Sequence, residues 1–416
     1  MALPPSSSPP KSPLAPCHAG IVGGGQLALM LGQAALGLGF EIDILAANAN
    51  EPVNHLPGAI IHHGPLNDAT ALLNLMERVH LVAFESELID LHVLEAAMAL
   101  NHSRAQVLPS PKAMGLCSDK LEQKRQLDLV HVPTAAWETL PTTATMKVSS
   151  WLSHLKDRFP AGFVLKWSRG GYDGRGTLIH HVGQDPESLL VAFIAAAAKR
   201  PSHVYAEQLV PFETELAVIS TRAADGRLAQ YPPVITRQSG GVCVEVQGPA
   251  VALGVSARAA AAALEQAQVI GTHFDLVGTF AVEFFVLNDE RVLVNEIAPR
   301  VHNSGHFSLD GAECSQFENH WRALSGAALG PTETSPFFGM INILGPEGYS
   351  GPVPTTPAFN REGIVGHWYH KTESRPGRKM GHINVTAPHR DLLDQRLVEA
   401  ASLAASWQLD LQRENS

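Results

Sequence analysis

The stretch GTFAVEFFVLNDERVLVNEIA, residues 278–298, decides the fold of this chain. Two apolar runs flank a polar tip at residues 288–290, a pattern that predicts an antiparallel β-hairpin. Pairing across the tip places Glu283 opposite Glu296. Facing carboxylates in apolar strands repel each other and are costly to bury, and a divalent cation removes both costs. We therefore expect this pair to hold Mg²⁺ against nucleotide phosphates, with Asn295 beside it. In the alternative, a slipped register sends one glutamate to solvent.

A glycine-rich loop follows an earlier strand in FVLKWSRGGYDGRG, residues 163–176. The loop is not a Walker A sequence, because Thr177 and Leu178 follow its last glycine. Glycines let backbone amides approach phosphate oxygens, and Lys166 on the strand adds a positive charge. A lysine in an apolar strand needs an anionic partner, which favours a phosphate site over a hairpin tip with a solvated lysine.

Composition narrows the class of protein. A chain of 416 residues predicts two or three domains, and a formal charge of −10 argues against a nucleic-acid binder. Four widely spaced cysteines indicate reduced thiols and a cytoplasmic location, and we find no apolar run long enough to span a membrane. The Pro/Ser-rich opening, residues 1–18, lacks a signal peptide's apolar region and is expected to be a disordered tail.

The pattern of the chain changes along its length. Residues 19–115 show a strand, a glycine turn, a helix and further strands (LVAF, 81–84, among them), as in a doubly wound α/β layer. Ser110 and Asp119 are expected to cap two helices, the second with Glu122 at capping-box spacing.

Residues 116–330 carry antiparallel strand patterns and an alanine-rich helix at 256–268. We expect this domain to have two lobes that divide near residue 205. A small β-rich domain is expected over residues 331–416.

Two further patterns suggest anion sites. Gly23-x-Gly25-x-x-Ala28 opens a helix after a strand, either as a dinucleotide-binding turn or as a tight turn that only lets the helix pack. Cations also gather in the loops 300–306 and 370–382 of this acidic protein, either as a binding pocket or as ordinary surface charge. These cations are Arg300, Lys371, Arg375, Arg378 and Lys379.

Several blocks together resemble one enzyme family. They are GGGQL, KLEQK, LKWSRGGYDGRG, VPFETEL, NEIAPRVHNSGH and RPGRKMGH. Their order is similar to that of the N5-carboxyaminoimidazole ribonucleotide synthetases, ATP-grasp enzymes of purine biosynthesis, over roughly residues 19–390. The resemblance implies an ATP-grasp fold, α/β and α+β, with a Rossmann-like preATP-grasp domain before it and a small β-rich domain after it.

The resemblance also implies a reaction and its partners. ATP would phosphorylate bicarbonate to carboxyphosphate, and the amine of 5-aminoimidazole ribonucleotide would capture the carboxyl group. Mg²⁺ would assist, and the chain would form a homodimer without binding nucleic acid or membrane.

The resemblance assigns roles residue by residue. Arg300, His302, Asn303, Lys371 and Arg378 would be catalytic; Gln26, Glu85, Tyr172, Asp173, Arg375 and Lys379 would bind the ribonucleotide. ATP would contact Lys120, Lys166, Gly171, Gly174, Glu207, Gln208, Leu209, Val210, Glu215 and Asn295, and Glu283 and Glu296 would bind the metal.

The chain departs from the family pattern at Leu29, Leu88, Val301 and His370, which puts contacts with the ribonucleotide in doubt more than contacts with ATP. Three alternatives stay open: an ATP-grasp ligase for formate or another carboxylate, a nicotinamide-dependent oxidoreductase resting on Gly23 and Gly25, and a homologue that only binds nucleotide.

Overall fold

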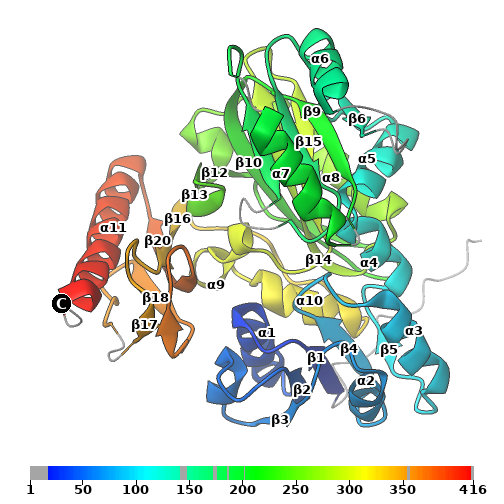
Figure 1. Ribbon diagram of the computed structural model, residues 1–416. Coiled ribbons are helices and arrows are strands. Elements are labelled where there is room, and N and C mark those ends of the chain that lie inside the picture. The colour runs from blue at the N-terminus through cyan, green and yellow to red at the C-terminus, as the bar shows by residue number, and fades with distance from the viewer. Residues whose placement is uncertain are drawn as a thin grey trace, which may run out of the picture.

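A computed structural model describes residues 17–140, 148–171, 176–184, 187–200, 202–353 and 357–413. Figure 1 shows the first part of the chain (residues 17–115) in blue at the bottom and the middle part (residues 116–330) in green and yellow above it. The last part (residues 331–413) is in orange and red at the left. Over the described residues, no helix is both long enough and apolar enough to cross a membrane.

The first part is a parallel sheet in the order β3-β2-β1-β4-β5. This confirms the predicted doubly wound layer, including the strand at 81–84. Its elements are β1 (His18–Val22), α1 (Gln26–Gly37), β2 (Glu41–Ala46), η1 (Pro52–His55), β3 (Ala59–His63), α2 (Ala69–Met76), β4 (Leu81–Phe84), α3 (Leu91–Leu100) and β5 (Gln106–Val107).

Two capped helices, α4 (Pro111–Ser118) and α5 (Lys120–Leu129), lead into the middle of the chain. As predicted, the Ser110 hydroxyl caps the first, and the Asp119 carboxylate accepts two backbone N–H groups of the second. The capping box is not completed in the expected way, because the Glu122 carboxylate bonds Gln126 (2.8 Å) further along its own helix.

A small antiparallel sheet in the order β6-β9-β7-β8 forms the upper lobe. Its elements are β6 (Trp137–Thr139), α6 (Val148–Arg158), β7 (Phe163–Trp167), β8 (Thr177–His180), α7 (Glu187–Ala198) and β9 (Val204–Gln208). The two helices bury Trp151, Leu155 and Leu190 in one core with the sheet.

The largest sheet has nine strands and runs β15-β14-β10-β12-β13-β16-β20-β18, with β11 on β10. It consists of β10 (Phe212–Arg222), β11 (Leu228–Gln230), β12 (Val234–Ser239), β13 (Val242–Gly248), β14 (Gly278–Leu287), β15 (Val292–Ala298), β16 (Phe337–Leu344), β18 (Ile364–Trp368) and β20 (Lys379–Ala387). Because β13 pairs with β16, the last part of the chain shares one sheet with the middle part.

Other elements pack around this sheet. They are η2 (Ala250–Leu253), α8 (Ala257–His273), η3 (Asn303–Gly305), α9 (Ser308–Gly311), α10 (Gln316–Leu324), the pair β17 (Gly351–Pro352) and β19 (Glu373–Ser374), and α11 (Arg390–Arg413). Helix α8 is capped by Ser256 and ends at His273, later than the predicted end at 268.

Helix α11 adds a long helix to the β-rich end that the sequence predicts. It runs for 24 residues and packs on β16 and β20. Its apolar side chains recur at helical spacing, a signal that the sequence carried. The buried ones are Leu393, Leu397, Ala400, Ala404, Trp407 and Leu411.

Candidate active site

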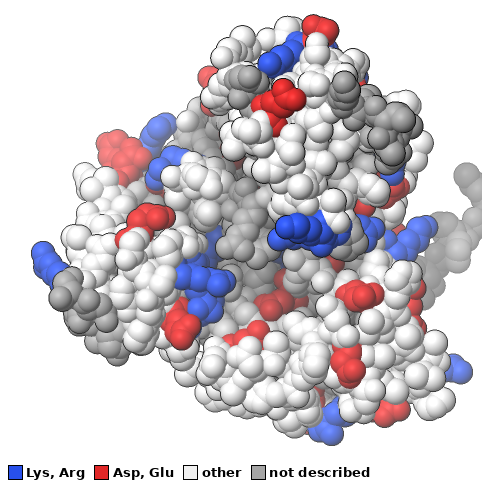
Figure 2. Space-filling model, in the orientation of Figure 1, with Lys and Arg blue, Asp and Glu red and all other residues white. Residues whose placement is uncertain are grey.

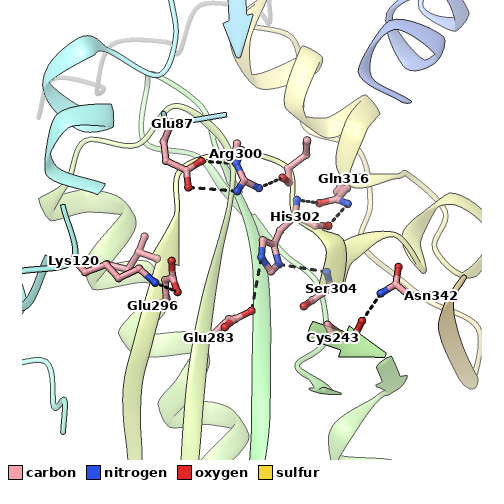
Figure 3. Close-up of polar contacts among 12 residues, drawn as sticks. Glu87, Lys120, Cys243, Glu283, Glu296, Arg300, His302, Ser304, Gln316 and Asn342 are labelled. Atoms are coloured by element: carbon pink, nitrogen blue, oxygen red, sulfur yellow. Dashed lines mark hydrogen bonds and ion pairs between the residues drawn. The ribbon is translucent and has the colours of Figure 1, made fainter. Parts of the chain in front are cut away.

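The hairpin β14–β15 has the predicted pairing, with Glu283 opposite Glu296. Directly opposed residues of an antiparallel pair extend from the same face, so both carboxylates lie on one side of the sheet (Figure 3). The register shifts next to this pair, since Phe284 faces Val294 and Asn295 is left as an extra residue. This β-bulge, a feature common beside active sites, turns Asn295 toward Lys166, whose Nζ lies 3.1 Å from its Oδ1.

The paired glutamates lie among charged groups of both signs. Lys120 Nζ is 2.7 Å from Glu296 Oε2, and His302 Nε2 is 3.7 Å from Glu283 Oε1 (Figure 3). Burial raises the pKa of Glu283 to about 7, and the negative charges of Glu296 and Glu215 add to the rise. Burial, with the charge of Arg300, lowers the pKa of His302 to about 3, so this imidazole is neutral at physiological pH.

This carboxylate pair fits a magnesium ion. Its side chains stay 24% and 36% exposed, so a ligand can reach them, and burial together with nearby negative charge raises the pKa of Glu283, a shift that a bound cation would oppose. Over the described part of the chain, no group of three or more His, Cys, Asp and Glu side chains could hold a metal ion. Two carboxylates suffice where nucleotide phosphates and water complete the octahedron that Mg²⁺ requires.

Lys166 has the anionic partner that its place in an apolar strand demands. Its Nζ lies 2.7 Å from Glu207 Oε2, and Lys124 Nζ lies 2.8 Å from the other carboxylate oxygen. Burial alone would raise the pKa of Glu207, but the two lysines outweigh it and lower that pKa to about 2. One carboxylate thus lies between buried Lys124 and partly buried Lys166, and the three groups carry a net positive charge when both amines are protonated.

The segment from Glu207 to Val210 lies where β9 leaves the small sheet. Its backbone is held by Gln208 N–H donating to the Ala136 carbonyl (2.8 Å) and Leu209 N–H donating to the Gly162 carbonyl (3.0 Å). On the large sheet, Glu215 lies two residues from Ala217, which pairs with Glu283, so Glu215 extends from the face of the paired glutamates. Burial raises the pKa of Glu215.

The turn after β15 carries Arg300, His302 and Asn303. The Arg300 guanidinium binds Glu87 of the first part of the chain in a bidentate pair, at 2.5 and 3.4 Å (Figure 3). Asn303 is buried, and among the described residues neither atom of its amide has a hydrogen-bond partner. A buried amide without protein partners can exchange hydrogen bonds with a bound polar ligand or with water.

The cation-rich loop at residues 370–382 contacts the first part of the chain, because His370 stacks on His55. Lys371 is buried and donates to the Lys379 carbonyl (2.7 Å), and Arg378 donates to the Glu373 carbonyl (2.7 Å). Burial, with the charge of Arg378, lowers the pKa of Lys371 to about 7, while the charge of Glu85 opposes this shift. Figure 2 shows a hollow between the parts of the molecule with Lys and Arg side chains on its border.

The glycine turn before α1 holds a carboxylate. Glu85 Oε1 accepts from Gly25 N–H (2.9 Å) and Oε2 accepts from Ala28 N–H (3.3 Å). A side chain at Gly23 or Gly25 would collide with Glu85. The helix N-terminus that a dinucleotide phosphate would need is therefore occupied by Glu85. Gln26 begins α1 beside this carboxylate.

The remaining predicted residues divide into two groups. Gly171 is the last described residue before a gap in the glycine-rich loop, and Tyr172, Asp173 and Gly174 lie outside the described residues. Arg375 lies in the loop between β19 and β20, where its carbonyl approaches Gly345 closely.

Two residues of the site were missed by sequence reasoning. Lys124 follows Lys120 by four residues on one helix, a spacing that places both on one face and was available as a signal. Glu87 had no such signal, because it meets Arg300 across 213 residues of chain.

Two of the departures from the family pattern have a structural explanation. Leu29 and Val301 are both buried in the first hydrophobic core, where apolar side chains are expected.

Comparisons with known proteins agree with this geometry. The family models that match are a ribonucleotide synthetase preATP-grasp domain (residues 17–118), an ATP-grasp domain (126–317) and a phosphoribosylaminoimidazole carboxylase C-terminal domain (339–396).

Two relatives are similar to this chain over most of their length. The chain is 36% identical over 398 residues to an N5-carboxyaminoimidazole ribonucleotide synthase of Synechococcus elongatus, covering 94% of this chain and 95% of the relative. It is 34% identical to the synthase of Mycobacterium leprae, covering 93% and 88% of the two chains.

Solved structures extend the likeness to the fold. A synthetase from Thermus thermophilus matches with a TM-score of 0.78 and 31% identity, covering 92% of this chain and 98% of that one. The Aspergillus clavatus synthase, solved in complex with ADP and 5-aminoimidazole ribonucleotide, matches with a TM-score of 0.79 and 27% identity, covering 94% and 99%.

Proposed function

The chain belongs to the N5-carboxyaminoimidazole ribonucleotide synthase family, and from this membership we propose how its residues divide the reaction among them. It is an ATP-grasp ligase that carboxylates 5-aminoimidazole ribonucleotide at the expense of ATP. The observation that carries the assignment is the Glu283–Glu296 pair on one face of the sheet, with Lys120 in contact. A nicotinamide-dependent oxidoreductase is not favoured, because it would bind its dinucleotide at the glycine turn before α1, and the Glu85 carboxylate already bonds that turn.

The ATP site in this proposal lies between the small and large sheets. Lys120 and Lys166 neutralise phosphate charge, and Lys124 is linked to Lys166 through their shared neighbour Glu207. Phosphoryl transfer needs little from a protein besides positioning and charge neutralisation, which these fixed ammonium groups supply. The backbone of Gln208, Leu209 and Val210 would meet adenine, Glu215 the ribose hydroxyls, and Gly171 and Gly174 the phosphates.

Glu283 and Glu296 would hold Mg²⁺ in this proposal, and Asn295 beside them would reach a nucleotide phosphate or the metal. A bound Mg²⁺ would supply positive charge that offsets the charge of the nucleotide phosphates. The raised pKa of Glu283 supports this assignment, because bringing a divalent cation there stabilises the ionised carboxylates.

Bicarbonate and carboxyphosphate are proposed to bind beside Arg300, His302 and Asn303. Arg300 presents a fixed positive charge already oriented by Glu87. His302 is uncharged at neutral pH, so it can hydrogen-bond the bicarbonate without competing for its proton. The unpartnered amide of Asn303 offers both a donor and an acceptor.

The ribonucleotide is proposed to bind in the hollow between the first part of the chain and the last loop. Lys371, Arg375, Arg378 and Lys379 would hold its 5′-phosphate, and Gln26, Glu85, Tyr172 and Asp173 would contact the rest of it. The buried position of Lys371 supports this role, because a phosphate would offset the cost of burying its charge. Carboxyphosphate would then meet the amine within a site shielded from water.

The test is ATP hydrolysis with Mg²⁺, measured with and without bicarbonate and 5-aminoimidazole ribonucleotide. Stimulation that requires both supports the proposal. Stimulation by formate in place of bicarbonate would support the sister ligase, and binding of ATP with no turnover under any condition would favour a homologue that only binds nucleotide.

Two further proposals concern the oligomeric state and the cellular location of the enzyme. A homodimer through the first part of the chain rests on the family likeness, and sedimentation equilibrium tests it. A cytoplasmic location is supported by four free cysteines, which suit a reducing compartment.

A further inference from the structure

The turn that carries Arg300, His302 and Asn303 has little regular structure of its own. Its regular part is η3, three residues long. Irregular segments have few internal hydrogen bonds, so the position of a side chain on such a turn depends on what holds its backbone.

A single buried side chain holds His302 by both of its backbone groups. Gln316, the first residue of α10, has no exposed surface. Its Oε1 accepts from His302 N–H (2.9 Å) and its Nε2 donates to the His302 carbonyl (2.8 Å), as Figure 3 shows. The amide therefore pairs with His302 as a neighbouring β-strand would.

The same amide reaches a second histidine. Gln316 Nε2 lies 3.2 Å from His306 Nδ1. Because the two bonds to His302 fix which end of the amide is nitrogen, the second hydrogen of Nε2 is donated to Nδ1. Neutral His306 consequently carries its proton on Nε2.

Only a carboxamide of this length can make the three bonds together. Asparagine is one methylene too short, and glutamate has no N–H to donate. The turn also fits closely around the amide, since a Cβ at Gly305 would lie 2.5 Å from Gln316 Oε1.

Gln316 is itself tied to the strand of the paired glutamates. Thr279 of β14 donates its hydroxyl to the Gln316 carbonyl (2.8 Å), and Gln316 N–H donates to Ser308 Oγ (2.9 Å). Thr279 and Glu283 lie four residues apart on one strand. Gln316 thus connects the backbone of His302 to the strand that carries Glu283.

We propose that Gln316 is a positioning residue, which holds His302 over Glu283 through its bidentate bond to the His302 backbone. This inference rests on the proposed role of His302 at the bicarbonate or carboxyphosphate site. Gln316 is fully buried, and the role proposed for it runs through the backbone of His302 and not through contact with substrate.

The experiment compares two isosteric changes in one helix of the full chain. Gln316→Glu removes the two bonds that the amide donates, to the His302 carbonyl and to His306 Nδ1, and Gln316→Met removes all three bonds without adding a charge. Asn319→Asp is the matched control, because Asn319 is equally buried one turn later and bonds Tyr231 and Gly330 instead.

Both Gln316 variants are expected to lower kcat on the order of a hundredfold, as displacement of a catalytic group does, with KM for ATP within about twofold of the parent. Asn319→Asp is expected to lower Tm comparably and to keep kcat. Equal losses of kcat in all three variants, or unchanged kcat in a folded Gln316→Met, would overturn the proposal.

A His302→Ala variant separates this inference from the function on which it rests. If His302→Ala is inactive while Gln316→Met is fully active, the positioning role is wrong and the role of His302 stands. If His302→Ala turns over normally, the proposed role of His302 is wrong, and the role of Gln316 falls with it.

Discussion

Glu283 and Glu296 show how two side chains can be stable in a folded protein and still be poised for a ligand. Lys120 offsets part of their charge at 2.7 Å from Glu296. Glu283, which has a neutral histidine at 3.7 Å, keeps a pKa raised to about 7 by burial and by its neighbours. The negative charge of the two carboxylates is therefore only partly balanced by Lys120, and the partly exposed pair can attract a cation.

Glu296→Gln is expected to lower turnover by at least about a hundredfold, because the neutral amide no longer stabilises a cation beside the phosphates. Glu290→Gln at the exposed tip of the same hairpin is the control and is expected to be fully active. Steady-state ATP hydrolysis over a Mg²⁺ titration measures both. Parent-like kcat in a folded Glu296→Gln would contradict the metal role.

Lys371 predicts a dependence on pH. Its pKa is lowered from 10.5 in the open chain to about 7 in the fold, chiefly by burial. The folded protein therefore holds fewer protons between these two values, and its stability rises with pH across that window. A bound phosphate favours the charged amine, so affinity for the ribonucleotide is expected to weaken as pH rises above about 7.

Calorimetry in two buffers of different ionisation enthalpy measures this effect at about pH 8, inside the window where the amine is neutral in the free protein. The parent is expected to take up a proton on binding the ribonucleotide, and Lys371→Met is expected to lose that uptake. Lys112→Met, at a lysine outside the proposed site, serves as control. Identical proton uptake in the parent and in Lys371→Met would exclude Lys371 as its source.

At the scale of single elements, local departures from regular geometry place side chains in the proposed site. The bulge at Asn295 lets two successive residues of β15, Asn295 and Glu296, meet Lys166 and Lys120 respectively. In a regular strand, neighbours point to opposite faces. At the start of α1, the glycine turn has a comparable purpose, because it makes room for Glu85 against the helix N-terminus.

Gly23→Ala tests that purpose. Gly23 has φ +113° and a Cβ there would collide with Glu85, whereas Gly39, with φ +82°, has open space around it. Both substitutions cost about 1–2 kcal/mol of backbone strain, and only Gly23→Ala adds about 1–3 kcal/mol of overpacking. Urea unfolding of Gly23→Ala and Gly39→Ala measures the difference. Equal destabilisation would show that the turn does not depend on the fit around Glu85.

His370 connects two distant parts of the molecule. This residue adopts φ +56°, a left-handed conformation that favours glycine, which is common at this position in the family pattern. Its ring stacks on His55 of the first part, with centroids 5.0 Å apart. Lys371 follows His370 in the chain, so this lysine lies close to the contact between the two parts.

At the scale of the whole molecule, α10 joins the first part of the chain to the large sheet. Trp321 is fully buried, donates from Nε1 to the Leu31 carbonyl (2.8 Å) and packs edge-on against Phe40. The same helix begins with Gln316 at the turn that carries His302. One short helix, α10, therefore contacts the first part of the chain at Trp321 and the proposed active site at Gln316.

Trp321→Phe is expected to lose about 1 kcal/mol of stability with the hydrogen bond and to speed amide exchange in α1. Trp407→Phe is the matched control, because its indole N–H is buried and has no hydrogen-bond partner within the described residues. Hydrogen exchange by mass spectrometry compares them. Unchanged exchange in α1 of Trp321→Phe would show that this contact does not hold the first part in place.

Much of the fold and the site could be predicted from local patterns. The hairpin register, the caps at Ser110 and Asp119 and the strand at 81–84 each depend on a few neighbouring residues. Helix α11 also had a local signal, and the prediction of a β-rich end overlooked it. The glycine turn at Gly23 and Gly25 remained ambiguous. A dinucleotide-binding turn and a tight turn that only lets the helix pack have the same local sequence, and they differ only in which group lies against the N-terminus of α1.

The sequence by itself determined that two glutamates face each other across a hairpin and that a buried lysine needs an anion, since pairing and desolvation act between near neighbours. Only the tertiary structure decided that Glu207 is that anion, that Glu87 orients Arg300, and that β13 joins β16 in a single sheet. Those contacts join residues far apart in the chain, where no local periodicity constrains which surfaces meet.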